Sequence, residues 1–159
     1  MVKIGMQICG TLENVAKVLT PQPEFMYFMK LQCTSCQEVS ETWVAVSASD
    51  EVQGRTGRSI VSHLSVCKFC HKEKIMTVLQ DTNSEYTKDD DERFKTIIVF
   101  DCRGVEPVDF DFRDGWTVVS VSGRKFTDIE IEDGEWVDFD EDLKESVALY
   151  SMKSQFVKV

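Results

Sequence analysis

Six cysteines carry the clearest chemistry of this chain, and four of them occur as two C-x-x-C pairs. The pairs are Cys33/Cys36 and Cys67/Cys70, and thirty residues separate them. A C-x-x-C turn places two thiolates about one tetrahedral edge apart, so two such turns can hold a structural Zn²⁺ ion at roughly 2.3 Å from each sulfur. We therefore predict one structural zinc ion bound by Cys33, Cys36, Cys67 and Cys70, with no coordination position left for water.

Two other uses of these cysteines stay open. A redox-active C-x-x-C needs its first cysteine at the N-terminus of a helix, and no helical pattern follows Cys36 or Cys70. Structural disulfides are disfavoured in a reducing compartment. Because the sequence contains no secretory apolar region and no charge-free run longer than nine residues, we expect a cytoplasmic protein, with the nucleus as a second location.

The charge of the chain is unevenly distributed. The net charge is −10, but residues 1–80 contain 7 acidic and 8 basic residues, whereas residues 81–159 contain 21 acidic and 10 basic residues. Such a balance disfavours nucleic acid and anionic membranes as partners, because both attract positive charge. It favours a basic protein partner, whose binding would weaken with salt.

The elements that must position the cysteines are mostly strands. Apolar and polar residues alternate from 3 to 12, and short apolar or β-branched runs follow at 25–31, 42–47, 75–79, 96–100, 116–121, 126–131 and 147–157. Glycines and prolines recur between the runs, while residues 141–149 fit two turns of helix. The pattern predicts a mainly β protein with a mixed sandwich and barrel architecture.

We expect two lobes, which can also form one compact unit. Residues 1–80 form a zinc-binding β lobe, residues 81–93 an acidic, solvated polar loop, and residues 94–159 an acidic β lobe. A degenerate internal duplication is a further hypothesis: an apolar strand ending at Cys33 and followed by Trp43 parallels one ending at Cys102 and followed by Trp116. The second copy would then have lost its metal ligands.

The remaining candidates favour structure over catalysis. Cys9 and Cys102 are expected to be small buried hydrophobes, His63 an ordinary core or surface residue, and His71 an exposed residue or a neighbour of the site. Gly104, together with a proline at 107, predicts a tight turn. No acid–base or nucleophile constellation is evident, so we expect no enzymatic activity.

Several blocks together resemble a known family, the eukaryotic CXXC-motif-containing zinc-binding proteins, long catalogued as a domain of unknown function. Besides the two cysteine pairs, the matching blocks are residues 11–14, 94–97, 102–110, 145–147 and 155–157. The resemblance implies a small, soluble, mainly β protein with one zinc ion held by the four matched cysteines, and it brings no established catalytic activity.

Two functions are therefore expected. The first is a monomeric zinc protein whose four-cysteine site is structural and which acts through protein–protein contacts. The alternative is a metal-handling protein that uses its C-x-x-C thiolates, which also suit Cu(I), to carry zinc or copper.

Overall fold

The computed structural model describes residues 2–53 and 60–159. Strands account for 65% of the structure and helices for 4%, so the predicted mainly β class is confirmed. The helical part consists of two 3₁₀ helices, η1 (Gln80–Thr82) and η2 (Lys88–Asp90). None of the described helices has the length and apolar character needed to cross a membrane.

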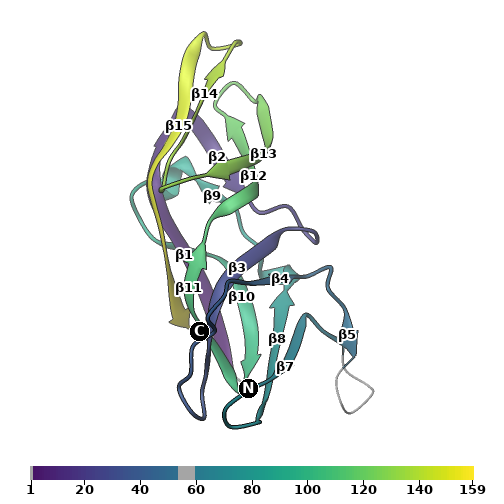
Figure 1. Cartoon of the computed structure of the whole chain (residues 1–159). Helices are drawn as coiled ribbons and strands as arrows, with labels where there is room; N and C mark the ends of the chain where they lie inside the picture. Colours follow the sequence, from purple (N-terminus) through teal and green to yellow (C-terminus); the bar gives the residue numbers. More distant parts are fainter. Residues whose placement is uncertain (1, 54–59) are drawn as a thin grey trace.

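A six-stranded antiparallel sheet, curled into a half-barrel, runs along the molecule (Figure 1). Its two longest strands, β1 and β15, extend over most of the molecular length and bring the two chain ends to the same region. In spatial order its strands are β14 (Trp136–Asp140), β15 (Glu145–Lys158), β1 (Val2–Glu13), β10 (Lys95–Arg103), β8 (Glu73–Leu79) and β7 (His63–Val66).

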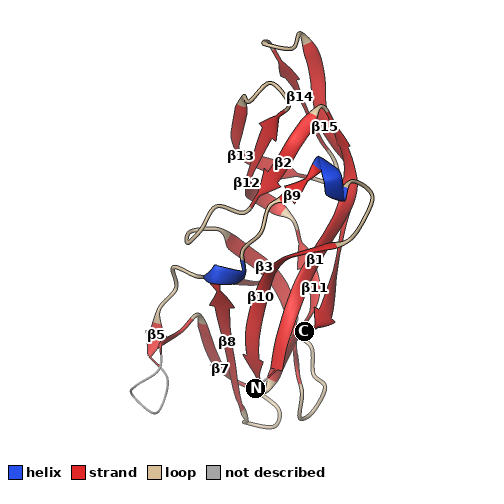
Figure 2. Cartoon of the chain, turned by 180° about the vertical axis from the view of Figure 1, so that it is seen from behind, coloured by secondary structure: helices blue, strands red, loops and turns tan. Residues whose placement is uncertain are grey.

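Three smaller sheets complete the structure, which is seen from behind in Figure 2. The three-stranded sheet contains β11 (Val105–Asp111), β3 (Met26–Cys33) and β4 (Val44–Ser47). The four-stranded sheet contains β13 (Lys125–Ile131), β12 (Arg113–Ser120), β2 (Val15–Leu19) and β9 (Tyr86–Thr87). The last is a hairpin of β5 (Val52–Gln53) and β6 (Ile60–Val61).

Residues 1–80 and 94–159 contribute strands to the same sheets. β1 lies between β10 and β15, β3 pairs with β11, and β2 pairs with β12. These pairings connect the two segments into one unit, and the first-half turns that carry the cysteine pairs lie at the end of the molecule opposite β14 (Figure 1).

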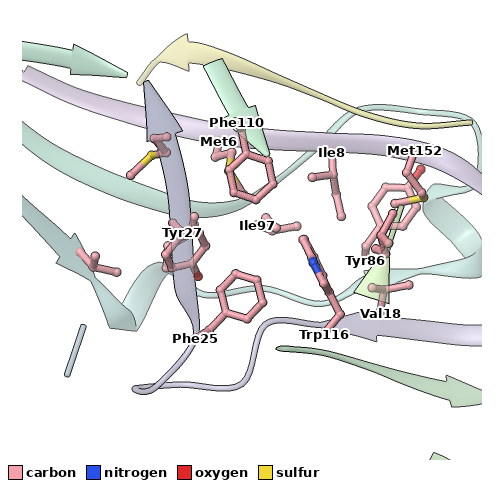
Figure 3. Close-up of a cluster of buried hydrophobic side chains, with 14 of the residues drawn as sticks. Met6, Ile8, Val18, Phe25, Tyr27, Tyr86, Ile97, Phe110, Trp116 and Met152 are labelled. Atoms are coloured by element: carbon pink, nitrogen blue, oxygen red, sulfur yellow. The ribbon is translucent and has the colours of Figure 1, made fainter. Parts of the chain in front are cut away.

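One contiguous apolar cluster joins the sheets, with aromatic side chains at its centre (Figure 3). The fully buried Trp116 packs edge-on against Phe25 at 5.0 Å and stacks on Phe112 at 5.5 Å between ring centroids. In β3 the buried residues alternate with partly exposed ones and end with Cys33, because successive side chains of a strand point to opposite faces. The same period that buries Tyr27 therefore directs the Cys33 sulfur inward.

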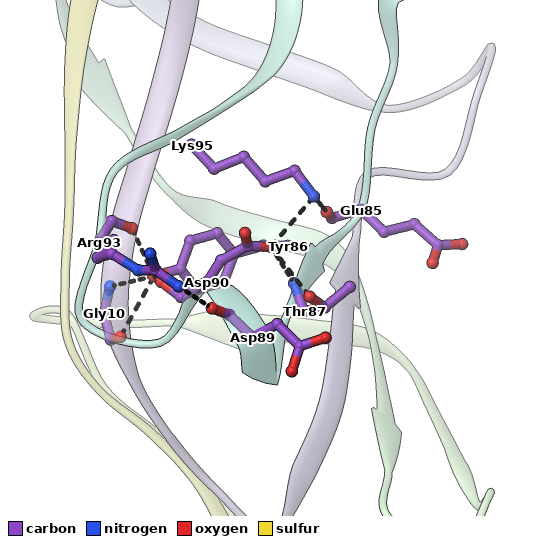
Figure 4. Close-up of polar contacts among 8 residues, drawn as sticks. All are labelled: Gly10, Glu85, Tyr86, Thr87, Asp89, Asp90, Arg93 and Lys95. Atoms are coloured by element: carbon purple, nitrogen blue, oxygen red, sulfur yellow. Dashed lines mark hydrogen bonds and ion pairs between the residues drawn. The ribbon is translucent and has the colours of Figure 1, made fainter.

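The segment predicted as a solvated polar loop, residues 81–93, differs from that prediction at Tyr86. This side chain is fully buried, and its hydroxyl lies 2.6 Å from the carbonyl oxygen of Asp90 and 2.7 Å from that of Arg93 (Figure 4). The hydroxyl also accepts the amide N–H of Gly10 at 3.3 Å. The Asp90 carboxylate in turn binds Lys95 at 3.1 Å. Together with the bonds from the Leu12 amide to Asp91 and from the Glu92 amide to Gly10, the buried Tyr86 side chain attaches this acidic segment to β1.

Two local predictions are wrong. Residues 141–149 do not form a helix: they form a turn, and β15 begins at Glu145. The cause is tertiary, because Val147 and Leu149 lie between β14 and β1 and are fully buried there. Pro107 is part of β11 rather than of a turn, at a register irregularity where a residue without an N–H is tolerated.

Candidate metal centre

The four predicted ligands come together in one cluster. The Cys33 and Cys70 sulfurs are 3.6 Å apart, the Cys36 and Cys67 sulfurs are 3.5 Å apart, and all four lie within 4.8 Å of one another. A tetrahedral ion at about 2.3 Å from each sulfur separates neighbouring sulfurs by about 3.8 Å. The spacing therefore fits a single zinc ion held by all four.

The first cysteine turn follows directly from the end of β3. Cys33 is the last residue of that strand, and its amide N–H donates to the carbonyl oxygen of Glu38 at 2.8 Å. The amide N–H of Gln37 donates back to the Cys33 carbonyl oxygen at 2.9 Å. Gln37 closes this turn with a φ of 68°, a left-handed conformation that usually favours glycine.

The second cysteine turn repeats the same pattern between β7 and β8. The amide N–H of Cys67 donates to Lys72 and that of His71 donates to Cys67, both to carbonyl oxygens at 2.9 Å. His71 has a φ of 61° and an exposed side chain, so it contributes to the site through its backbone. Two structurally equivalent turns, one from each of two sheets, therefore face each other across the cluster.

Backbone amides prepare one sulfur in each turn for the ionised form. The amides of Cys36 and then Ser35 donate to the Cys33 sulfur and lower the pKa of Cys33. In the second turn the amide of Cys70, with that of the residue before it, lowers the pKa of Cys67 to about 6. These hydrogen bonds stabilise the thiolate, which is the form that binds a metal ion.

The pKa of Cys36 shifts in the opposite direction. The Glu38 amide N–H favours the thiolate of Cys36, but burial and the neighbouring sulfurs outweigh it and raise the pKa of Cys36 to about 12. Four negative sulfurs this close cannot all ionise in the absence of a cation. A divalent ion at the centre supplies the missing charge, so the donor set fits zinc in charge as well as in spacing.

The site is closed on one side and open on the other. Cys33 and Cys67 are 1% and 3% exposed, whereas Cys36 and Cys70 are partly exposed. When bound, zinc with four sulfur ligands supplies a rigid cross-link between the turns rather than an activated water. Arg58, which is close in sequence to Cys67, lies outside the described residues.

Gly104 supports both turns, a role that sequence reasoning missed. It links β10 to β11, and its carbonyl oxygen accepts the Thr34 amide of the first turn at 3.2 Å. A Cβ on Gly104 would lie 2.4 Å from the carbonyl oxygen of Glu73. Glu73 pairs with Val66, the last residue of β7, directly before the second turn. The sequence predicted only a turn at Gly104, and the φ of +72° agrees with one.

The other sequence candidates lie outside the cluster. Cys9 and Cys102 are both buried in strands, and burial raises the pKa of Cys102 to about 12. His63 is half-buried and its Nε2 lies 3.0 Å from the Ser65 hydroxyl. Burial, followed by the nearby charge of Lys74, lowers the pKa of His63. Within the described residues only the four cysteines of the two turns form a group that could hold a metal ion.

Comparison with known proteins gives matches over almost the whole chain. Residues 5–157 match the family model described as "CXXC motif containing zinc binding protein, eukaryotic". The chain is 40% identical to a CXXC motif containing zinc binding protein of Bos taurus, with 99% of both chains covered. It is 38% identical to UPF0587 protein CG4646 of Drosophila melanogaster, with 100% of this chain and 99% of the other covered.

A solved structure has the same fold. The crystal structure titled C1orf123 superposes with a TM-score of 0.94 at 38% identity and covers 99% of both chains.

Proposed function

This chain belongs to the eukaryotic family of CXXC motif containing zinc binding proteins, and we propose that its single zinc ion is structural and that it acts through protein–protein contacts. The observation that supports this most strongly is the closed four-sulfur cluster. It connects the end of β3, in one sheet, to the β7–β8 turn, in another. A zinc ion there cross-links two sheets at one end of the molecule.

The structural role can be tested by counting reactive thiols. Chelation should release one zinc ion per chain and make four thiols rapidly reactive, because Cys36 and Cys70 are already partly exposed and loss of the ion frees the two turns that bury Cys33 and Cys67. Cys9 and Cys102 should stay protected, since both are buried in strands. A protein that keeps its thermal stability and its slow thiol reaction after complete metal removal would contradict a structural ion.

The contact surface that we propose for a basic partner lies at the opposite end. Residues 128–145 contain ten acidic residues and one basic residue, and Val137 and Phe139 are exposed on β14 among them. Apolar groups within a field of one charge sign suit a partner of the opposite sign. Pull-down at low and high salt tests this: capture of a basic protein that declines with salt supports it, and salt-insensitive or absent capture contradicts it.

Metal handling is a second candidate, and the partial exposure of Cys36 and Cys70 supports it. An incoming thiolate ligand could approach the ion from that side. Isotope exchange separates the two functions, because a structural ion should exchange slowly with free zinc and a delivered ion rapidly when a thiol-bearing acceptor is present. We propose no catalytic activity and expect a monomer, which light scattering in solution would test.

A further inference from the structure

A groove lies beside the two cysteine turns, between two sheet edges. Its volume is about 300 Å³. One wall is formed by residues 38–44, which connect the first cysteine turn to β4. The other wall is formed by β7, the last strand of the six-stranded sheet, together with the second cysteine turn. The second wall thus contains β7, an edge strand whose backbone groups are available to a further strand, while the first wall leads into β4, which ends the three-stranded sheet.

Three exposed apolar side chains line this groove and are called the apolar patch below. Val39 is 43% exposed, Val66 is 45% exposed and Phe69 is 66% exposed. Phe69 stands in the second C-x-x-C turn, where its amide N–H donates to the Cys67 sulfur. A large aromatic ring on a backbone fixed by hydrogen bonds is already positioned for contact, so ordering it on binding costs little entropy.

The two sides of the groove carry opposite charges. Glu38 and Glu41 form an acidic lip on the first wall, and Lys68 and Lys74 form a basic lip on the second. A nucleic acid would be repelled by the acidic lip, and an uncharged ligand would leave both lips without counterparts. The charge pattern fits a polypeptide that brings one charge of each sign.

We propose that this groove binds an extended segment of a partner protein. The segment places an apolar anchor residue on the apolar patch, an acidic side chain towards the basic lip and a basic side chain towards the acidic lip. It lies along the exposed edge of β7 and adds a strand there. This surface is separate from the acidic end around β14, so it does not depend on the basic partner proposed above.

The distance between the two walls depends on the cysteine turns. Val39 is bridged to Gln32 of β3, and the Cys33 amide N–H donates to Glu38, so the first wall continues directly from the first turn. The second wall contains Cys67 itself. The inference rests on the proposed structural zinc only in this respect: removing the ion should separate the walls and weaken binding.

The test uses a displayed library of random peptides selected on the zinc-loaded full chain, and the enriched peptides are then measured on the Phe69→Ser variant. Phe69→Ser removes the largest ring of the patch, and Phe139→Ser is the matched control, because it removes an exposed aromatic ring at the other end. Selected peptides should carry an apolar anchor with charges of both signs. They should lose about 30-fold in affinity for Phe69→Ser, as for a hot-spot residue, and bind Phe139→Ser like the wild type. Zinc content must be equal in all three proteins.

Exchanging the charges of one groove residue and its peptide partner tests which peptide charge faces which lip. Glu41→Lys should weaken the selected peptides, and changing their basic residue to an acidic one should restore binding to that variant. The proposal is overturned if no peptide is enriched, if Phe69→Ser and Phe139→Ser bind equally, or if peptide charge has no effect. Loss of binding after chelation supports the structural zinc, whereas full binding by the metal-free chain contradicts that role and leaves the groove supported by the Phe69 result.

Discussion

Replacing Gly104 with alanine should weaken zinc binding although Gly104 is not a ligand. Its φ of +72° is left-handed, which costs an alanine about 1–2 kcal/mol. The added Cβ would lie 2.4 Å from the Glu73 carbonyl oxygen, and because real Cβ contacts stay above 3.0 Å, the two backbones must separate by at least 0.6 Å. This displacement acts on the second cysteine turn through the pairing of Glu73 with Val66, and on the first turn through the Thr34 amide.

The expected effects are a loss of stability and a loss of metal affinity. Strain and displacement together should cost about 3 kcal/mol, which for a chain of this size lowers Tm by about 6–12 °C. Zinc affinity should fall by about 10–100-fold, the usual cost of disturbing a group that positions metal ligands. The assays are thermal unfolding and competition for zinc with a chelator of known affinity.

Gly123→Ala is the matched control. Gly123 also has a positive φ, of +94°, but a Cβ there meets no atom within 4 Å. This variant should lose about 1–2 kcal/mol from backbone strain alone and bind zinc like the wild type. If Gly104→Ala binds zinc as tightly as Gly123→Ala does, Gly104 does not support the cysteine turns, and the reasoning is refuted.

Three further changes test the rest of the fold. Trp116→Ala should destabilise the protein by about 3–5 kcal/mol in denaturant unfolding, because the ring is fully buried in the aromatic centre of the core; a loss below about 1 kcal/mol would contradict that packing. Tyr86→Phe should cost about 1–3 kcal/mol and speed amide exchange in residues 88–93, because it removes the hydroxyl that bonds these loop carbonyls and leaves the buried Gly10 amide N–H without that acceptor; unchanged exchange there would refute the anchoring role. Asp140→Asn should lower Tm at neutral pH, and its difference from the wild type should shrink as pH falls from about 4 to 2. Burial acts to raise the pKa of Asp140, but the hydroxyls of Ser120 and Ser122 and two backbone amides outweigh it and lower that pKa to about 2. A folded-state pKa below the unfolded value gives stability that is present above the unfolded pKa and is lost as pH falls through the folded one; a pH-independent difference between Asp140→Asn and the wild type would contradict this.

Much of the strand content was predictable because it depends on local pattern. The apolar runs of β3 and β10 identify both strands without knowledge of their partners. β14 shows where this reasoning fails. Its pattern directs Val137 and Phe139 outward and buries Asp140, the reverse of a hydrophobic face. The hydroxyls of Ser120 and Ser122, which are distant in sequence, make that burial favourable together with two amides of the following turn, and no local pattern indicates the two serines.

The four-cysteine cluster was predictable, and its structural support was not. Two C-x-x-C pairs specify four sulfurs, and the structure brings those four together. Each turn is closed by a residue in the left-handed conformation, Gln37 in the first and His71 in the second. Because neither is a glycine, the sequence did not indicate these closures. The contact of Gly104 with both turns depends on how β10, β8 and β3 meet, which no local pattern records.

The apolar core and the four-cysteine cluster lie in different parts of the molecule. The contiguous core includes Leu31 and Met76, but it contains none of the four ligand cysteines and no residue of β7, all of which lie in the described part of the chain. The strand β7 and the turn after it are therefore held by pairing with β8 and by the sulfur cluster. An edge hairpin with few apolar contacts is among the first regions of a protein to open. If the proposed zinc is structural, it should contribute most at the wall of the groove that carries Phe69, where the core contributes least.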